Sequence, residues 1–169
     1  MSLDKRGEGV FGMSFGVIFS IIVIIAIIGV AVYAIIYFLN LNTCTQIGLF
    51  YDALQKEIGE AWTSSIYNAP LNARLGDSDI DAVCFGTLTQ QPETTDDRNK
   101  QQELKSYSYE PKSNLFLLPP NKACDGELAA FVLEHIQTNR FFCVQGGEGT
   151  SKVALKKEVS DALVTLSKT

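Results

Sequence analysis

Four cysteines are the residues whose chemistry is most readily predicted from their type and spacing. They are separated by 40, 40 and 19 residues, and they form no C-x-x-C pair: Cys44, Cys84, Cys124 and Cys143. The sequence offers few ligands for a zinc site, because the chain contains one histidine, His135. An even number of cysteines in a domain of this size favours two disulfides, and three pairings stay open.

The other reactive residues form no recognisable catalytic or metal site. Asp77, Asp79 and Asp81 alternate like the first ligands of a calcium loop, but Leu88 stands where that loop needs its bidentate glutamate. The segment GGEGTSK (residues 146–152) lacks the spacing of a phosphate-binding loop. His135 has no predicted acid–base partner. We therefore expect no catalytic residue, no metal, no cofactor and no enzymatic activity.

A long apolar segment precedes all four cysteines. Residues 9–51 contain no Asp, Glu, Lys or Arg, and residues 17–39 are almost entirely aliphatic or Phe. About 20 such residues suffice for a helix to cross about 30 Å of hydrocarbon. The segment is longer than the core of a signal peptide and lacks a small-residue cleavage site. We predict a retained transmembrane helix at residues 13–39.

Flanking charge predicts the orientation of this helix. Lys5 and Arg6 precede it, and the first charge after it is Asp52. The positive-inside rule places residues 1–12 in the cytoplasm and the domain at residues 40–169 outside, where disulfides can form. The four charges in residues 1–12 cancel, so the net charge of −5 belongs to the outer domain. An acidic surface argues against a nucleic-acid partner.

Small residues in the predicted membrane helix could mediate helix packing. Gly12, Gly16 and Ser20 recur at four-residue steps and therefore share one helix face. Small residues let two helix backbones approach closely within a bilayer. The stripe predicts a homo- or hetero-oligomer in the membrane; the alternative is that glycine is simply common in membrane helices.

A second apolar stripe follows the membrane segment. Apolar residues recur at three- and four-residue steps from Ile47 to Trp62 and predict an amphipathic helix ending near Ser64. We expect its core to contain Tyr51, Leu54, Ile58 and Trp62. Both segments could form one helix of about 50 residues. The alternative is a break at residues 40–43, with Asn42 or Thr43 as N-cap.

The remainder of the chain predicts a small sheet. Five short runs have the composition of strands: residues 82–88, 113–118, 140–145, 152–156 and 162–167. We expect a solvated loop at residues 90–109, a short helix at 127–137 and a hairpin connection at 145–151. The fold class is then α+β: a long transmembrane helix extends into an amphipathic helix that packs on a small, mostly antiparallel sheet.

Two resemblances bear on function. Lys5-Arg6-Gly7, a short polar stretch and a long aliphatic helix together resemble the N-terminus of archaeal type IV pilins and archaellins. That resemblance implies cleavage after Gly7, a filament core made of helices and a β-rich head. The chain departs from it in having Glu8 directly after the cut and Gly12 where bacterial-type pilins have a glutamate.

The second resemblance covers most of the chain. GMSFGVIFSIIVIIAI, CTQIG, AWTSS, VCFGTL and NLFLLPP are similar to segments of a set of archaeal single-span membrane proteins. That set implies a topology and not an activity. We expect a membrane-anchored structural subunit of a cell-surface or envelope assembly. The alternative is a monomeric anchored binding or adhesion module, or an accessory subunit, that presents loops such as residues 90–109.

Overall fold

The computed structural model describes residues 15–76, 79–107, 109–146 and 152–169, and it divides the chain into two units, Met1–Leu39 and Asn40–Thr169. In the first unit, residues 16–39 belong to the helix α1 (Phe15–Thr63) and are exposed except for the half-buried Ala34. Among the described residues, α1 is the one helix that is long and apolar enough to cross a membrane.

Helix α1 has no break at residues 40–43, so the predicted alternative with an N-cap at Asn42 or Thr43 is wrong. Its end at Thr63 confirms the expected end near Ser64. Lys157 stabilises this end, because its ammonium group donates hydrogen bonds to the carbonyls of Trp62 and Ser64. A cation at the C-terminus of a helix also complements the helix dipole.

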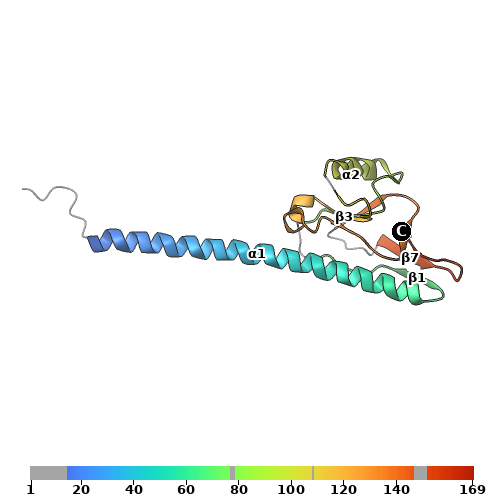
Figure 1. Ribbon diagram of the computed structural model, residues 1–169, viewed down its shortest axis with the longest axis horizontal. Coiled ribbons are helices and arrows are strands. Elements are labelled where there is room, and N and C mark those ends of the chain that lie inside the picture. Colours follow the sequence, from blue (N-terminus) through green and yellow to red (C-terminus); the bar gives the residue numbers. More distant parts are fainter. Residues whose placement is uncertain (1–14, 77–78, 108, 147–151) are drawn as a thin grey trace, which may run out of the picture. The chain divides into compact units, whose positions relative to one another are not determined.

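The head, residues 40–169, contains two four-stranded sheets rather than the one predicted (Figure 1). The first sheet has the order β1-β7-β8-β5. Its strands are β1 (Tyr67–Pro70), β7 (Val153–Lys157), β8 (Val164–Lys168) and β5 (Ile136–Thr138). The pair β5–β8 is parallel, and the other pairs in this sheet are antiparallel.

The second sheet has the order β4-β3-β2-β6 and is antiparallel throughout. Its strands are β4 (Ala130–Phe131), β3 (Leu115–Leu118), β2 (Ala82–Phe85) and β6 (Phe142–Gln145). All five predicted strand regions contain strands, so that part of the prediction is confirmed.

Both faces of the second sheet are buried. Alternate residues such as Val83 and Leu117 point into the main core, which contains the apolar stripe of α1 and the inner face of the first sheet. The residues between them, such as Cys84 and Phe116, form a second core with Leu104. Burial on both faces explains why β2 and β3 are continuous apolar runs with no polar alternation.

The prediction of a solvated loop at residues 90–109 is wrong, because this segment contains the helix α2 (Thr95–Lys105). Thr94 and Asp97 form a reciprocal capping box at its start. Leu104 is its buried apolar residue and covers the second sheet. The helix was missed because a single apolar residue gives almost no periodic signal.

The predicted helix at residues 127–137 is also wrong. This segment contains β4 and the start of β5, and His135 has a left-handed φ of 62°. The Asn114 side chain holds the segment open by accepting a hydrogen bond from the Leu133 N–H and donating one to the Leu133 carbonyl. These tertiary contacts outweigh the helical spacing of the apolar residues.

The strands β6 and β7 belong to different sheets, so they do not form the predicted hairpin; most of its connection, residues 147–151, lies outside the described residues. Two short 3-10 helices, η1 (Pro120–Lys122) and η2 (Cys124–Gly126), follow β3. They carry the third cysteine.

Candidate functional site

The four cysteines form two disulfides in the head, as the prediction of two disulfides required. Cys84 and Cys143 are directly opposed residues of β2 and β6, with Cα atoms 4.0 Å apart. Cys44 in α1 is joined to Cys124 at the start of η2, 80 residues away. Paired cysteines of this kind are typical of oxidising compartments.

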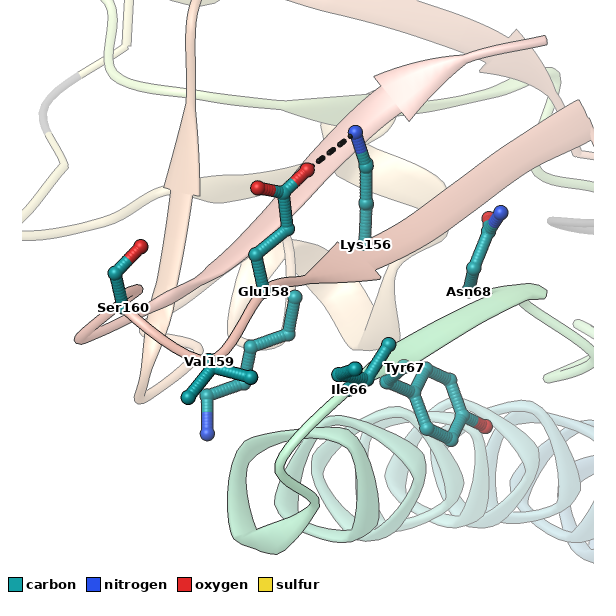
Figure 2. Close-up of a pocket in the computed structure, with 8 residues that line it drawn as sticks. Ile66, Tyr67, Asn68, Lys156, Glu158, Val159 and Ser160 are labelled. Carbon is teal, nitrogen blue, oxygen red and sulfur yellow. Dashed lines mark ion pairs between the residues drawn. The ribbon is translucent and has the colours of Figure 1, made fainter.

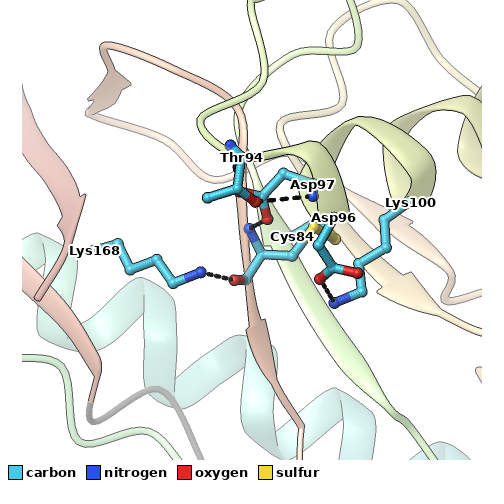
Figure 3. The surroundings of a disulfide bond; sticks show 7 residues. Cys84, Thr94, Asp96, Asp97, Lys100 and Lys168 are labelled. Carbon is cyan, nitrogen blue, oxygen red and sulfur yellow. Dashed lines mark hydrogen bonds and ion pairs between the residues drawn. A yellow bond between two sulfur atoms is a disulfide. The ribbon is translucent and has the colours of Figure 1, made fainter.

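The buried disulfide lies beside a buried carboxylate, Asp97 (Figure 3). Asp97 Oδ1 accepts a hydrogen bond from the Cys143 N–H at 2.9 Å, and Oδ2 accepts from the Thr94 hydroxyl at 2.7 Å. Lys168 Nζ donates to the Cys143 carbonyl at 2.9 Å. Asp97 and Lys168 thus bind the N–H and the carbonyl of Cys143 that point away from β2. Because β6 is an edge strand, these contacts block the pairing of another strand at this residue.

Sequence reasoning missed Asp97, although a signal for it existed. The spacing Thr94-x-x-Asp97 is that of a capping box at the start of a helix. It was overlooked because the surrounding segment is strongly polar.

The second disulfide is more open to solvent. Cys44 and Cys124 are both partly exposed, whereas Cys84 and Cys143 are 0% and 2% exposed. Cys124 also has a left-handed backbone with a φ of 54°. The two disulfides therefore have different surroundings.

The predicted helix-packing residues lie only partly within the described chain. Gly16 and Ser20 belong to α1 and are exposed, and the Ser20 hydroxyl donates to the Gly16 carbonyl at 2.7 Å. Gly12 and the predicted processing site Gly7 lie outside the described residues. Packing of this face on another helix stays a prediction.

Trp62 and His135 form an aromatic pair at the surface. Their rings are parallel within 9° with centroids 3.8 Å apart, and Trp62 Nε1 donates to the Ala162 carbonyl. Trp62 is 39% exposed, so its predicted place in the core is wrong, whereas Tyr51, Leu54 and Ile58 are buried as predicted. Trp62 faces the turn between β7 and β8, which only partly covers its ring.

Two tyrosines have raised pKa values. Burial raises the pKa of Tyr51, with a smaller contribution from Tyr109; its hydroxyl donates to the Leu128 carbonyl, and its ring stacks on Phe131 at 4.5 Å. Burial also raises the pKa of Tyr109 to about 12, assisted by Tyr107 and Glu103. The hydroxyl of Tyr51 is thus used in a hydrogen bond within the head.

The head has a groove of about 580 Å³ between β1 and the turn that joins β7 to β8 (Figure 2). Ile66 and Val159 line it and are strongly exposed, and Lys156 pairs with Glu158 across 2.9 Å. No pairing of a nucleophile with a base lines this groove. Its exposed apolar side chains suit contact with an apolar group.

No group of three potential metal ligands occurs among the described residues. Asp79 pairs instead with Lys122 at 3.2 Å, and Asp77 lies outside the described part of the chain. No family model matches the chain, and searches of the curated proteins and of the solved structures find no match either.

Proposed function

We propose that this chain is a membrane-anchored structural subunit of a cell-surface or envelope assembly. In this proposal the first half of α1 crosses the bilayer, residues 1–12 are cytoplasmic and residues 40–169 are outside. The subunits associate through the membrane helix. The architecture is pilin-like in its order of a long helix followed by a β-rich, disulfide-bonded head.

The observation that carries the proposal is the exposure of α1 over residues 16–39. Aliphatic side chains such as Ile25 and Val30 are more than 60% exposed there, with apolar residues on every side of the helix. Removing each such side chain from water is worth about 1.5–3 kcal/mol. This segment of α1 therefore needs a lipid or protein environment, and its length is sufficient to cross a bilayer.

The head supports the proposal because it has its own core. Its residues form one large apolar cluster and a smaller one, and both disulfides lie within residues 40–169. Two disulfides favour an oxidising compartment for the head and thus the predicted orientation. The Lys5-Arg6-Gly7 motif supports the comparison with pilins.

Association can be tested on the full-length protein extracted from its membrane in a mild detergent. The proposal expects particles larger than a monomer by light scattering. Gly16→Ile should weaken association by roughly tenfold, because a bulky side chain separates the helix backbones. The matched control is Gly29→Ile, since Gly29 lies about 140° around the helix axis and an added side chain there meets no other part of the described chain.

A monodisperse monomer would contradict this proposal. It would favour the second candidate, a monomeric anchored binding module, which the groove at Ile66 and Val159 supports. The intact mass of the same sample tests processing, because cleavage after Gly7 removes residues 1–7.

A further inference from the structure

The two disulfides differ in their access to external reagents. Cys84–Cys143 lies in the second core among buried residues such as Leu104 and Phe141, and both its cysteines are at most 2% exposed. Cys44–Cys124 joins two partly exposed residues. Thr45 and Lys122, which are close to these cysteines in the sequence, are exposed, whereas Ala123 directly before Cys124 is buried. Access of a thiolate to a sulfur atom governs the rate of thiol–disulfide exchange.

The backbone at Cys124 also distinguishes the exposed bond from the buried one. Cys124 has a φ of 54°, a left-handed conformation that is unfavourable for a residue with a β-carbon. No corresponding backbone strain occurs at Cys44, Cys84 or Cys143.

The segment around Cys124 has other contacts that would keep it in place after reduction. Ala123 is fully buried, and its carbonyl accepts a hydrogen bond from the Leu128 N–H. The Tyr51 hydroxyl of α1 donates to the Leu128 carbonyl. These contacts keep Cys124 near Cys44 when the bond opens, so the same bond can form again without unfolding of the head.

We propose that Cys44–Cys124 is a site of reversible thiol–disulfide exchange with an external dithiol, such as a thiol oxidoreductase, whereas Cys84–Cys143 is a permanent structural bond. This inference goes beyond the proposed function and does not depend on helix association. It gives the head a redox-controlled link between α1 and η2.

The dithiol supplies the two electrons that reduce Cys44–Cys124. One thiolate of the dithiol attacks a sulfur of Cys44–Cys124, forms a mixed disulfide and releases the other cysteine, which takes up a proton. The second thiol of the dithiol loses its proton and attacks the dithiol's own sulfur in the mixed disulfide, and the remaining cysteine leaves as a thiolate and takes up a proton. The chain then holds two thiols, and the dithiol has become a disulfide.

The test uses the full-length oxidised protein in detergent and dithiothreitol as the dithiol. Samples are quenched with N-ethylmaleimide at increasing times, and each cysteine is followed by peptide mass spectrometry. Cys44 and Cys124 should be modified at least about 100-fold faster than Cys84 and Cys143, since the buried pair requires partial opening of the head. Equal rates, or faster modification of Cys84 and Cys143, would overturn the proposal.

Two controls complete the test. In guanidinium chloride the two bonds should open at similar rates, because the fold no longer protects Cys84–Cys143. After reduction of the first bond and addition of oxidised glutathione, the folded protein should regain Cys44–Cys124 as the single product. Mixed pairings among the four cysteines would contradict a reversible site.

A double substitution provides a second readout. Cys44→Ser with Cys124→Ser should leave the far-UV circular dichroism of the head unchanged and should abolish the fast phase of thiol release. A fast phase that persists in this variant would assign it to Cys84–Cys143 and overturn the proposal. If the variant does not fold, the rates at which the four cysteines of the oxidised wild-type protein are modified still test the proposal.

Discussion

The two halves of α1 have the same secondary structure but present different surfaces. Over residues 16–39, apolar side chains are exposed all around the helix. In the second half, a stripe that includes Ile47, Leu54 and Ile58 is fully buried in the head, while Asp52 and Lys56 on the other side are exposed. A single stripe is typical of a helix on a protein core, and uniform apolarity is typical of a helix surrounded by lipid or by other helices.

This difference separates two functions within one helix. Side chains of the second half stabilise the head, whereas those of the first half have no core of their own within the described chain. Substitutions along α1 should therefore change the stability of the head in one half and the behaviour in membranes in the other.

The largest expected effect comes from the buried stripe. Phe50→Ala should lower the free energy of unfolding of the head by about 3–5 kcal/mol, because it opens a cavity in the main core. Phe38→Ala is the matched control in the first half, where Phe38 is 67% exposed. Denaturant unfolding of the full chain in detergent, followed by tryptophan fluorescence, measures both variants. Equal losses would remove the distinction between the two halves.

A smaller loss is expected from the buried carboxylate on α2. Asp97→Ala leaves the Cys143 N–H without an acceptor in the core and should cost about 2–3 kcal/mol. The control is the neighbouring Asp96→Ala, which removes an exposed pair with Lys100 and should unfold like the wild type. If both variants were equally stable, Asp97 would have no structural role in fixing the edge of the second sheet.

The smallest effect concerns the two tyrosines. Tyr51→Phe should destabilise the head by about 1 kcal/mol, because the Leu128 carbonyl loses its donor. Tyr109→Phe should be neutral, since the Tyr109 hydroxyl is buried without a hydrogen-bond partner among the described residues. Thermal unfolding of the two variants measures the difference in their stability. A larger loss of stability for Tyr109→Phe than for Tyr51→Phe would contradict the hydrogen bonding described for the two hydroxyls.

The same tyrosines predict a dependence on alkaline pH. The pKa of each is raised in the folded head, so the folded state retains both protons more tightly than the unfolded chain does. Their contribution to stability is complete below about pH 10, the pKa of an unfolded tyrosine, and is lost as the pH rises through the folded values. Denaturant midpoints measured from pH 8 to 12 should fall less in the variant that combines Tyr51→Phe and Tyr109→Phe.

The sequence predicted the parts of the fold that rest on a clear local apolar pattern, either periodic or continuous. The stripe from Ile47 to Ala61 gave the second half of α1, and continuous apolar runs gave β2, β3 and β6. It failed where contacts between distant residues decide the structure. The Asn114 side chain binds the backbone of Leu133 in a segment that is not helical, although its apolar spacing suits a helix.

The candidate sites were likewise predictable from local sequence features and not where they depend on contacts between distant residues. Two disulfides could be predicted from the number of cysteines, but their pairing depends on the register that brings Cys84 opposite Cys143. The placement of Asp97 beside that bond depends on α2, which carries one buried apolar residue and little periodicity. Trp62 was wrongly predicted to be buried, because the apolar pattern of a helix does not show at which residue the helix stops contacting the core.

The most direct test of the account is the accessibility of single introduced thiols in intact cells. Ser65→Cys lies in the exposed turn after α1, and Ser2→Cys lies before the predicted span. A membrane-impermeant maleimide should label Ser65→Cys in intact cells and Ser2→Cys only after lysis, with the protein staying in the membrane after carbonate washing. Labelling of Ser2→Cys alone in intact cells, or release of the protein by carbonate, would contradict an anchored head outside the cell.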